Sequence, residues 1–306
     1  TQLDMFKLPL RDTSGTRGRS AMYVELLSLL TAIGFGFSSI LTRWGMRDSN
    51  PMTGAMVGSL VQVLALSVII AVYPPAELNL MGVAYFAASG LLASALGRLL
   101  NYTSIQRLGV SMSSTIIGSS PLFSTIFAAI FLAEEVTLSI FVGTVLVVGG
   151  VAITSLKDGN VRELLSTAIL TPILAAAAYG ASSVFRKLGV DLMPHAPFGA
   201  MIGAATSLAS FSIYLVATGQ LGLFKLTQGS RKFFVLSGLV VTVAWLSMYS
   251  AFALGKVSVV SALIGTSPLF TLVLSLIFLR DTERITMRIA LGCLSIVAGA
   301  TVITIF

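Results

Sequence analysis

The sequence predicts an all-α membrane protein with ten transmembrane helices, arranged as two inverted repeats of five helices each. The first reason is composition: 56% of the 306 residues are hydrophobic and only 10% are charged, whereas a soluble domain is typically about 25% charged. The second is that the apolar residues gather in runs of membrane-spanning length. The third is that segments of the first half return in the second half. Together these features indicate that lipid is the solvent of this chain.

Ten apolar runs are long enough to cross the hydrocarbon core of a bilayer, which takes about 20 helical residues. Backbone polar groups in lipid must be paired within the protein, and the runs lack the alternating pattern of barrel strands, so a helical bundle is expected. Most connections are short, which predicts that successive helices are antiparallel. The predicted helices cover residues 22–42, 54–73, 80–105, 110–132, 138–156, 167–185, 198–218, 233–254, 257–279 and 285–306.

Three segments of the first half recur in the second half. Because each half holds five predicted helices, an odd number, the second half enters the membrane from the opposite side, which makes the repeat inverted. Inverted repeats are typical of secondary transporters, whose substrate lies near the midplane between the halves. The recurring segments are "GFSSILTRWG" from Gly36 with "GASSVFRKLG" from Gly180, "GAMVG" from Gly54 with "GAMIG" from Gly199, and "IGSSPLFSTIFAAIFL" from Ile117 with "IGTSPLFTLVLSLIFL" from Ile264.

The repeat divides the chain into four parts. Residues 1–21 form a polar, basic N-terminal tail, and residues 22–156 form the first five-helix repeat. Residues 157–166 are a linker, and residues 167–306 form the second repeat.

The repeated segments resemble the signature motifs of a known family. The run F/Y-G-x-S-S at 35–39 and 179–183, and the run S-P-L-F…I-F-L-x-E/D that ends at Glu134 and Asp281, are similar to signatures of EamA-type transporters of the drug/metabolite transporter superfamily. The resemblance covers residues 22–306. The sequence departs from it with Phe35 and Tyr179 where the family often has Trp, and with Asp-Thr-Glu at 281–283 where the family often has Gly-Glu.

That resemblance implies ten helices, cytoplasmic termini, and alternating-access transport of small polar metabolites, and we expect the plasma (inner) membrane as the location. The charge distribution disagrees with this orientation. With the N-terminus inside, the inner segments hold 7 Lys and Arg residues and the outer loops hold 11, the reverse of the positive-inside rule. We keep the N-terminus inside because the first helix and its basic tail often decide orientation.

Arg98 is the residue that points most directly to a binding site. It lies well inside the predicted helix 80–105, where an arginine costs at least about 2.5–3.5 kcal/mol on insertion scales and is expected to face the bundle interior or a wet cavity. Asn101 and Tyr102 share its helical face, and the repeat places Trp245 and Tyr249 on the matching face. An anionic metabolite could bind between them, although Arg98 could instead extend to the lipid headgroups. The substrate-binding candidates are Phe35, Ser38, Arg98, Asn101, Tyr102, Tyr179, Trp245 and Tyr249.

Each repeat also carries a proline inside an apolar run. Such a break is tolerated in lipid when Ser or Thr side chains satisfy the freed carbonyls, and hydroxyl residues precede both prolines. We interpret the pair as hinges flanking a central site; fixed kinks that only shape the bundle are the alternative. The helix-break residues are Gly118, Ser120, Pro121, Gly265, Ser267 and Pro268.

The sequence favours a transporter over other classes. It has no cluster of metal-ligating residues and no catalytic constellation, so we expect no enzyme activity, metal or cofactor. The basic excess is scattered over short loops, which indicates lipid headgroups rather than nucleic acid as the partner. No carboxylate falls near a helix midpoint, so carboxylate-based proton coupling has little support. The sole histidine, His195, is expected in a solvated loop. A non-transporting scaffold or sensor subunit on the same fold is the alternative, and the oligomeric state is open.

Overall fold

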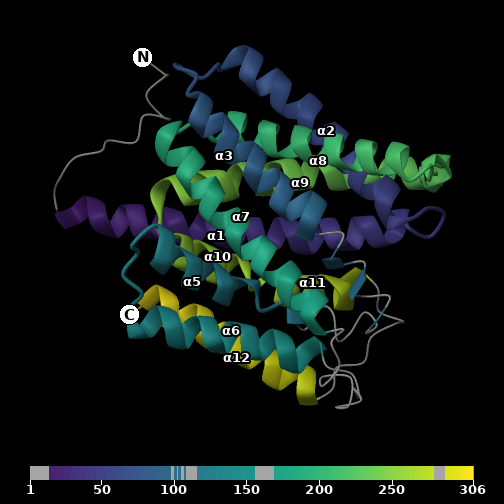
Figure 1. Ribbon diagram of the computed structural model, residues 1–306. Helices are drawn as coiled ribbons and strands as arrows, with labels where there is room; N and C mark the ends of the chain where they lie inside the picture. The colour runs from purple at the N-terminus through teal and green to yellow at the C-terminus, as the bar shows by residue number, and fades with distance from the viewer. Residues whose placement is uncertain are drawn as a thin grey trace.

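A computed structural model describes residues 14–97, 100–101, 103–104, 107, 116–155, 169–278 and 287–305. Throughout these residues the regular structure is helical (Figure 1). The α-helices are α1 (Ser14–Gly45), α2 (Pro51–Val72), α3 (Leu80–Gly90), α5 (Ser120–Phe131), α6 (Leu138–Ser155), α7 (Leu170–Leu192), α8 (Ala196–Ala217), α9 (Gln228–Leu254), α10 (Val257–Ile264), α11 (Ser267–Phe278) and α12 (Met287–Ile305). A π-helix, η2 (Leu91–Gly97), continues α3, and a short 3₁₀ turn, η5 (Leu221–Leu223), precedes α9.

The long helices run back and forth along one common direction, so that α1 begins and α12 ends on the same side of the bundle, the left side of Figure 1. Five segments are long and apolar enough to cross a membrane: Ala21–Gly45, Pro51–Val72, Ala196–Ala217, Gln228–Leu254 and Val257–Leu274. Shorter apolar helices accompany them. The predicted all-helical architecture is therefore confirmed for the described residues, and the count of ten spans stays a prediction.

The two halves interlock instead of packing side by side. The first helix of each half packs against the third helix of the other: α1 contacts α9, and α7 contacts α3. The equivalent helices α2 and α8 contact each other, as do α6 and α12. The repeated glycines explain how close this packing is. A Cβ on Gly36 would lie 2.9 Å from the backbone N of Thr271, and one on Gly180 would lie 2.8 Å from the backbone N of Ser124.

Both proline-containing runs are interrupted helices. A turn at 118–119 precedes α5, and a turn at 265–266 separates α10 from α11. Pro121 is the second residue of α5 after the N-cap Ser119, a position in the first turn where the missing N–H costs nothing. Hydroxyls satisfy carbonyls freed at the breaks: Ser119 donates to Ile116 at 2.6 Å and Thr266 donates to Leu263 at 2.7 Å.

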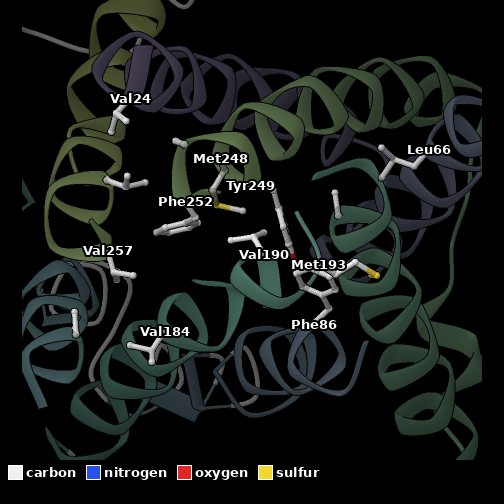
Figure 2. Close-up of a cluster of buried hydrophobic side chains, with 14 residues drawn as sticks. Val24, Leu66, Phe86, Val184, Val190, Met193, Met248, Tyr249, Phe252 and Val257 are labelled. Atoms are coloured by element: carbon white, nitrogen blue, oxygen red, sulfur yellow. The ribbon is translucent and has the colours of Figure 1, made fainter. Parts of the chain in front are cut away.

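The main hydrophobic core lies on the side of the bundle where α1 begins. It joins the start of α1, α8 and α10 and the middle of α3 to the end of α2, α5, α7 and α9, and these helix ends meet on one side because the helices are antiparallel. Figure 2 shows Phe86, Tyr249, Phe252 and Val257 among its members, and the rings of Phe86 and Tyr249 are 5.7 Å apart. This side of the bundle is therefore closed by packed apolar side chains.

A carboxylate ties the two halves together on the same side. Glu134, just after α5, accepts hydrogen bonds from the backbone N–H groups of Val257 and Ser258 at 2.6 and 3.1 Å, and from the Ser258 hydroxyl at 2.8 Å. A negative charge there stabilises the positive end of the α10 dipole. Ala133 adopts a left-handed conformation with φ of 51° to bring Glu134 into place.

Candidate substrate cavity

A cavity of about 800 Å³ lies between the two halves. Its wall is formed mainly by α1, α2, α5, α7, α9, α10 and α11 and the turns at both helix breaks, with single residues from η2, α6 and α8. Its volume falls within the range of about 300–1,000 Å³ that is usual for small-molecule sites.

The wall follows the internal symmetry of the chain. Residues at equivalent positions of the two repeats face the same space, so the symmetry axis of the bundle passes through the cavity. The equivalent pairs are Phe35 with Tyr179, Ser38 with Ser182, Ser39 with Ser183, Thr42 with Arg186, Gln62 with Ser207, Gly118 with Gly265, Ser120 with Ser267, and Pro121 with Pro268.

The symmetry fails along one stretch. Helix α2 lines the cavity from Pro51 to Gln62, whereas Ser207 is the one lining residue of the equivalent helix α8 within the described wall. Ala200 on α8 is fully buried, and a Cβ on Gly203 would lie 2.8 Å from the Tyr249 hydroxyl. The cavity therefore extends toward the side where α1 ends and α2 begins, and packing closes it on the opposite side.

The chemistry of the wall is mostly hydroxyl, amide and aromatic. Many hydroxyls donate to carbonyls of their own helix, as Ser182 does to Tyr179 at 2.7 Å and Ser207 does to Gly203 at 2.8 Å. Across the halves, Ser38 and Ser237 share a hydrogen bond of 2.8 Å. Among the described lining residues there is no Asp or Glu.

Arg186 is the cation of the described wall. It lies on α7, its side chain is only 8% exposed, and its Cζ atom is 5.8 Å from the centroid of the Trp245 ring. Its Nε is buried without a hydrogen-bond partner within the described structure. Stacking on Trp245 stabilises the guanidinium, and the unpaired N–H leaves it ready to bind an acceptor.

Two further polar groups of the wall are buried without a partner in the part of the chain that the structure describes. They are Nε2 of Gln62 and Oγ of Ser261, on residues that are 4% and 7% exposed. Buried polar groups are normally hydrogen-bonded, and an orphaned one needs an explanation. Their place in the cavity wall offers one, namely that a bound ligand supplies the partners.

Five of the eight predicted binding residues line this cavity: Phe35, Ser38, Asn101, Tyr179 and Trp245. All six helix-break residues line it as well, namely Gly118, Ser120, Pro121, Gly265, Ser267 and Pro268. Tyr249 does not. It is fully buried in the hydrophobic core because it fills the space beside Gly199 and Gly203. Arg98 and Tyr102 lie outside the described residues.

Sequence reasoning missed Arg186 because it ended the sixth helix at residue 185. Helix α7 continues to Leu192, so Arg186 lies inside the bundle. A signal was present: Tyr179, Ser182 and Arg186 are spaced i, i+3 and i+7 on one helical face. The next residue, Lys187, points elsewhere and forms an ion pair of 2.9 Å with Asp191.

The expectation for His195 was wrong. The ring is buried and caps α8, with Nδ1 accepting from the backbone N–H of Phe198 at 3.1 Å. Its other nitrogen lies 3.1 Å from the carbonyl oxygen of Tyr73, and the ring stacks on Tyr73 at 5.0 Å. Because Nδ1 accepts, Nε2 carries the proton and the ring is neutral. Burial lowers the pKa of His195, while the bond to the Tyr73 carbonyl opposes that shift.

Comparison with known families matches both repeats. The model of the EamA-like transporter family matches residues 22–156 and again residues 166–305. The chain belongs to the EamA-like transporter family. The two matches coincide with the two halves that enclose the cavity, so the resemblance noted in the sequence is confirmed.

Two known proteins are similar to this chain. The EamA-like chain is 23% identical over 280 residues to an "Uncharacterized transporter" of Archaeoglobus fulgidus, covering 89% of this chain and 94% of that one. A solved crystal structure of another protein superposes with a TM-score of 0.77 at 15% identity, covering 92% of this chain and 98% of that chain. This likeness concerns the fold alone. The family makes this chain an integral, multi-pass membrane protein of a transporter family.

Proposed function

We propose that this EamA-like protein is a secondary transporter that moves a small polar anionic metabolite by alternating access, through ten spans with both termini in the cytoplasm. The observation that carries the proposal is Arg186, a buried guanidinium in a cavity whose described wall holds no acidic residue. A buried charge is expected to be paired or to serve a function. An anionic group of the substrate is the partner that this wall lacks.

The surroundings of Arg186 suit a small polar molecule. The guanidinium is planar and binds carboxylate or phosphate oxygens through parallel hydrogen bonds. Gln62 and Ser261 add neutral groups that lack partners within the described structure, and Phe35, Tyr179 and Trp245 add aromatic surface. The site thus combines one charged contact with several weaker ones that select shape and polarity.

Alternating access is supported by the position of the helix breaks. Interrupted helices near the midplane are typical of secondary transporters, and both interruptions line this cavity. The one-sided extension of the cavity along α2 suits one end state of such a cycle. The symmetry-related arrangement, extended along α8 and closed along α2, would be the other end state.

Replacing Arg186 with Gln tests the proposal. Losing a charge-assisted hydrogen bond of about 1.5–3 kcal/mol should weaken anion binding by about 10- to 100-fold. The measurement is thermal stabilisation of the purified protein by inorganic phosphate, a monocarboxylate, a dicarboxylate and a sugar phosphate, with neutral sugars for comparison, since a ligand that binds the folded state raises its stability. Uptake of the same labelled anions into proteoliposomes measures transport.

Lys187→Gln is the matched control, because it removes the same charge one residue along α7 from a side chain that is paired with Asp191 and lies outside the cavity wall. It should leave binding and uptake unchanged. Anion binding that survives Arg186→Gln would show that Arg186 is structural. An absence of both stabilisation and uptake for the whole panel would instead favour a non-transporting scaffold or sensor.

Coupling to protons is not expected to drive this transport. A relay normally needs a carboxylate near the midplane, and the described wall offers none. Uptake should therefore respond little to an imposed proton gradient.

A further inference from the structure

The charge of the cavity bears on how the transporter returns across the membrane. We infer that it is an obligatory exchanger, in which the cavity reorients only when an anion occupies it; this inference rests on the proposed anion site. An empty carrier would have to close over Arg186 with no opposite charge beside it.

Among the residues that the structure describes, no acidic side chain lines the cavity to balance Arg186. In the described wall, Arg186 is the charged residue and no acidic side chain accompanies it. The segment 98–115, most of which lies outside the described residues, contains Arg98 and Arg107 but no Asp or Glu. The nearest acidic residue along α7, Asp191, is already paired with Lys187. The charge of the described cavity wall is therefore positive until a ligand arrives.

Neutral groups of the wall do not replace that ligand. The Trp245 ring, 5.8 Å from the guanidinium carbon, offers a weak attraction. The hydroxyls of Ser182 and Ser207 donate their hydrogens to helix carbonyls and can offer Arg186 only lone pairs. Arg186 keeps its Nε–H buried and unpaired among the described residues. While the cavity extends toward one membrane face, water can hydrate the rest of the guanidinium.

Closing the cavity removes that water. The far side of the bundle is sealed by packed apolar side chains such as Phe86, Tyr249 and Phe252 (Figure 2), and the equivalent closure along α2 would leave an empty site equally dry. A buried charge without a partner is strongly disfavoured, whereas a paired one is tolerated. The bound anion therefore lowers the barrier to reorientation, and the empty protein waits in an open state.

The test compares uptake into two kinds of proteoliposome. One kind is loaded inside with the unlabelled form of the anion that is supplied outside as the labelled probe. The other contains buffer with an impermeant sulfonate. The probes are phosphate, a monocarboxylate, a dicarboxylate and a sugar phosphate. We expect uptake of a transported probe to be at least about tenfold faster into the loaded vesicles. This ratio corresponds to a reorientation barrier that is lower by about 1.4 kcal/mol. Equal uptake into both vesicles would overturn the exchange mechanism and leave the proposed transport function intact.

Substitution of Arg186 separates this mechanism from a structural effect. Arg186→Gln should bring the ratio of loaded to unloaded uptake close to one, even where total uptake is low, because the charge that penalises the empty return is gone. Lys187→Gln should keep the ratio of the unmodified protein. A ratio that stays high in Arg186→Gln would contradict the role of this charge. Failure of every probe to enter loaded vesicles would count against the proposed function itself, and exchange would fall with it.

Discussion

Two adjacent residues on α7 show how one helical step decides the role of a side chain. Arg186 faces the cavity and is 8% exposed, while Lys187, about 100° further around the helix, pairs with Asp191. The sequence alone pointed to Arg98 as the cation of the site. Choosing between cations on a helix needs the true end of that helix, which apolar content does not mark when Arg, Lys and Asp continue it.

His195 predicts a pH-dependent loss of stability. In the unfolded chain its imidazole takes up a proton as the pH falls below about 6.5, but in the folded protein burial lowers the pKa and keeps the ring neutral. The unfolded state thus binds more protons below about pH 6.5, so the stability contributed by His195 is complete above that pH and is lost progressively as the pH falls below it. Thermal unfolding in detergent at pH 7.5, 6.5 and 5.5 measures this loss.

His195→Asn is the control for that measurement. Asparagine can still accept the hydrogen bond at the start of α8, but it does not titrate. Since His195 is the only histidine of the chain, the difference between the two proteins across this pH range isolates its contribution. Identical pH profiles for both proteins would show that the buried ring does not control stability.

At the scale of elements, the apolar pattern predicted where helices lie better than where they stop. The long segments α2, α8 and α9 agree with their predicted spans within five residues at each end, because continuous apolar residues are what lipid requires. Helix α1 instead begins at Ser14, ahead of the predicted residue 22. The predicted run 257–279 is two helices, α10 and α11. The turn at 265–266 carries no charged residue, so only Gly265, Thr266 and Pro268 mark the break in the sequence.

The paired breaks lead to a prediction about transport rate. Replacing Pro121 and Pro268 with Ala restores two backbone donors, which allows α5 and α11 to extend across the turns that precede them. If those turns act as hinges, the double variant should transport several-fold more slowly, because stiffer hinges slow the conformational step that limits turnover. The anion concentration for half-maximal binding should stay within about twofold, because the substitutions leave Arg186 in place. Initial uptake into proteoliposomes and thermal-shift titration measure the two quantities.

Pro197→Ala is the matched control for the breaks. Pro197 holds the same second position of its helix as Pro121 but begins α8, outside the described cavity wall and away from any break. Its replacement should leave the uptake rate unchanged. A double variant at Pro121 and Pro268 that transports at the normal rate would identify the breaks as fixed kinks.

At the scale of the whole molecule, the repeat predicted the architecture but not the state of the cavity. Equivalent sequence segments in the two halves predicted that equivalent residues line the cavity. Phe35 with Tyr179, and Pro121 with Pro268, follow that rule. The difference between the two sides arises from packing: Tyr249 fills the space beside Gly199 and Gly203, so the α8 side is closed. Two similar halves can close the cavity at either end, the two closures being related by the two-fold rotation of the inverted repeat. Only the three-dimensional packing shows which one is present.

This asymmetry predicts different reactivity at two equivalent alanines. Ala55 in "GAMVG" lines the cavity, whereas Ala200 in "GAMIG" is fully buried. In a background where the single cysteine Cys293 is replaced with Ala, Ala55→Cys should react with a charged, membrane-impermeant thiosulfonate at least about tenfold faster than Ala200→Cys, because the reagent needs water at the thiol. Labelling of the purified protein in detergent, followed by mass spectrometry, measures the rates.

The same two variants determine the orientation of the protein in its membrane. With the N-terminus in the cytoplasm, the end of α1 and the start of α2 face outward, so Ala55→Cys should react in intact cells. Reaction only after permeabilisation would place this end of the cavity in the cytoplasm and would agree with the excess of basic residues in the loops on that side. Equal reactivity of the two cysteines in detergent would contradict a cavity closed along α8, because both sides would then admit water over the course of the cycle.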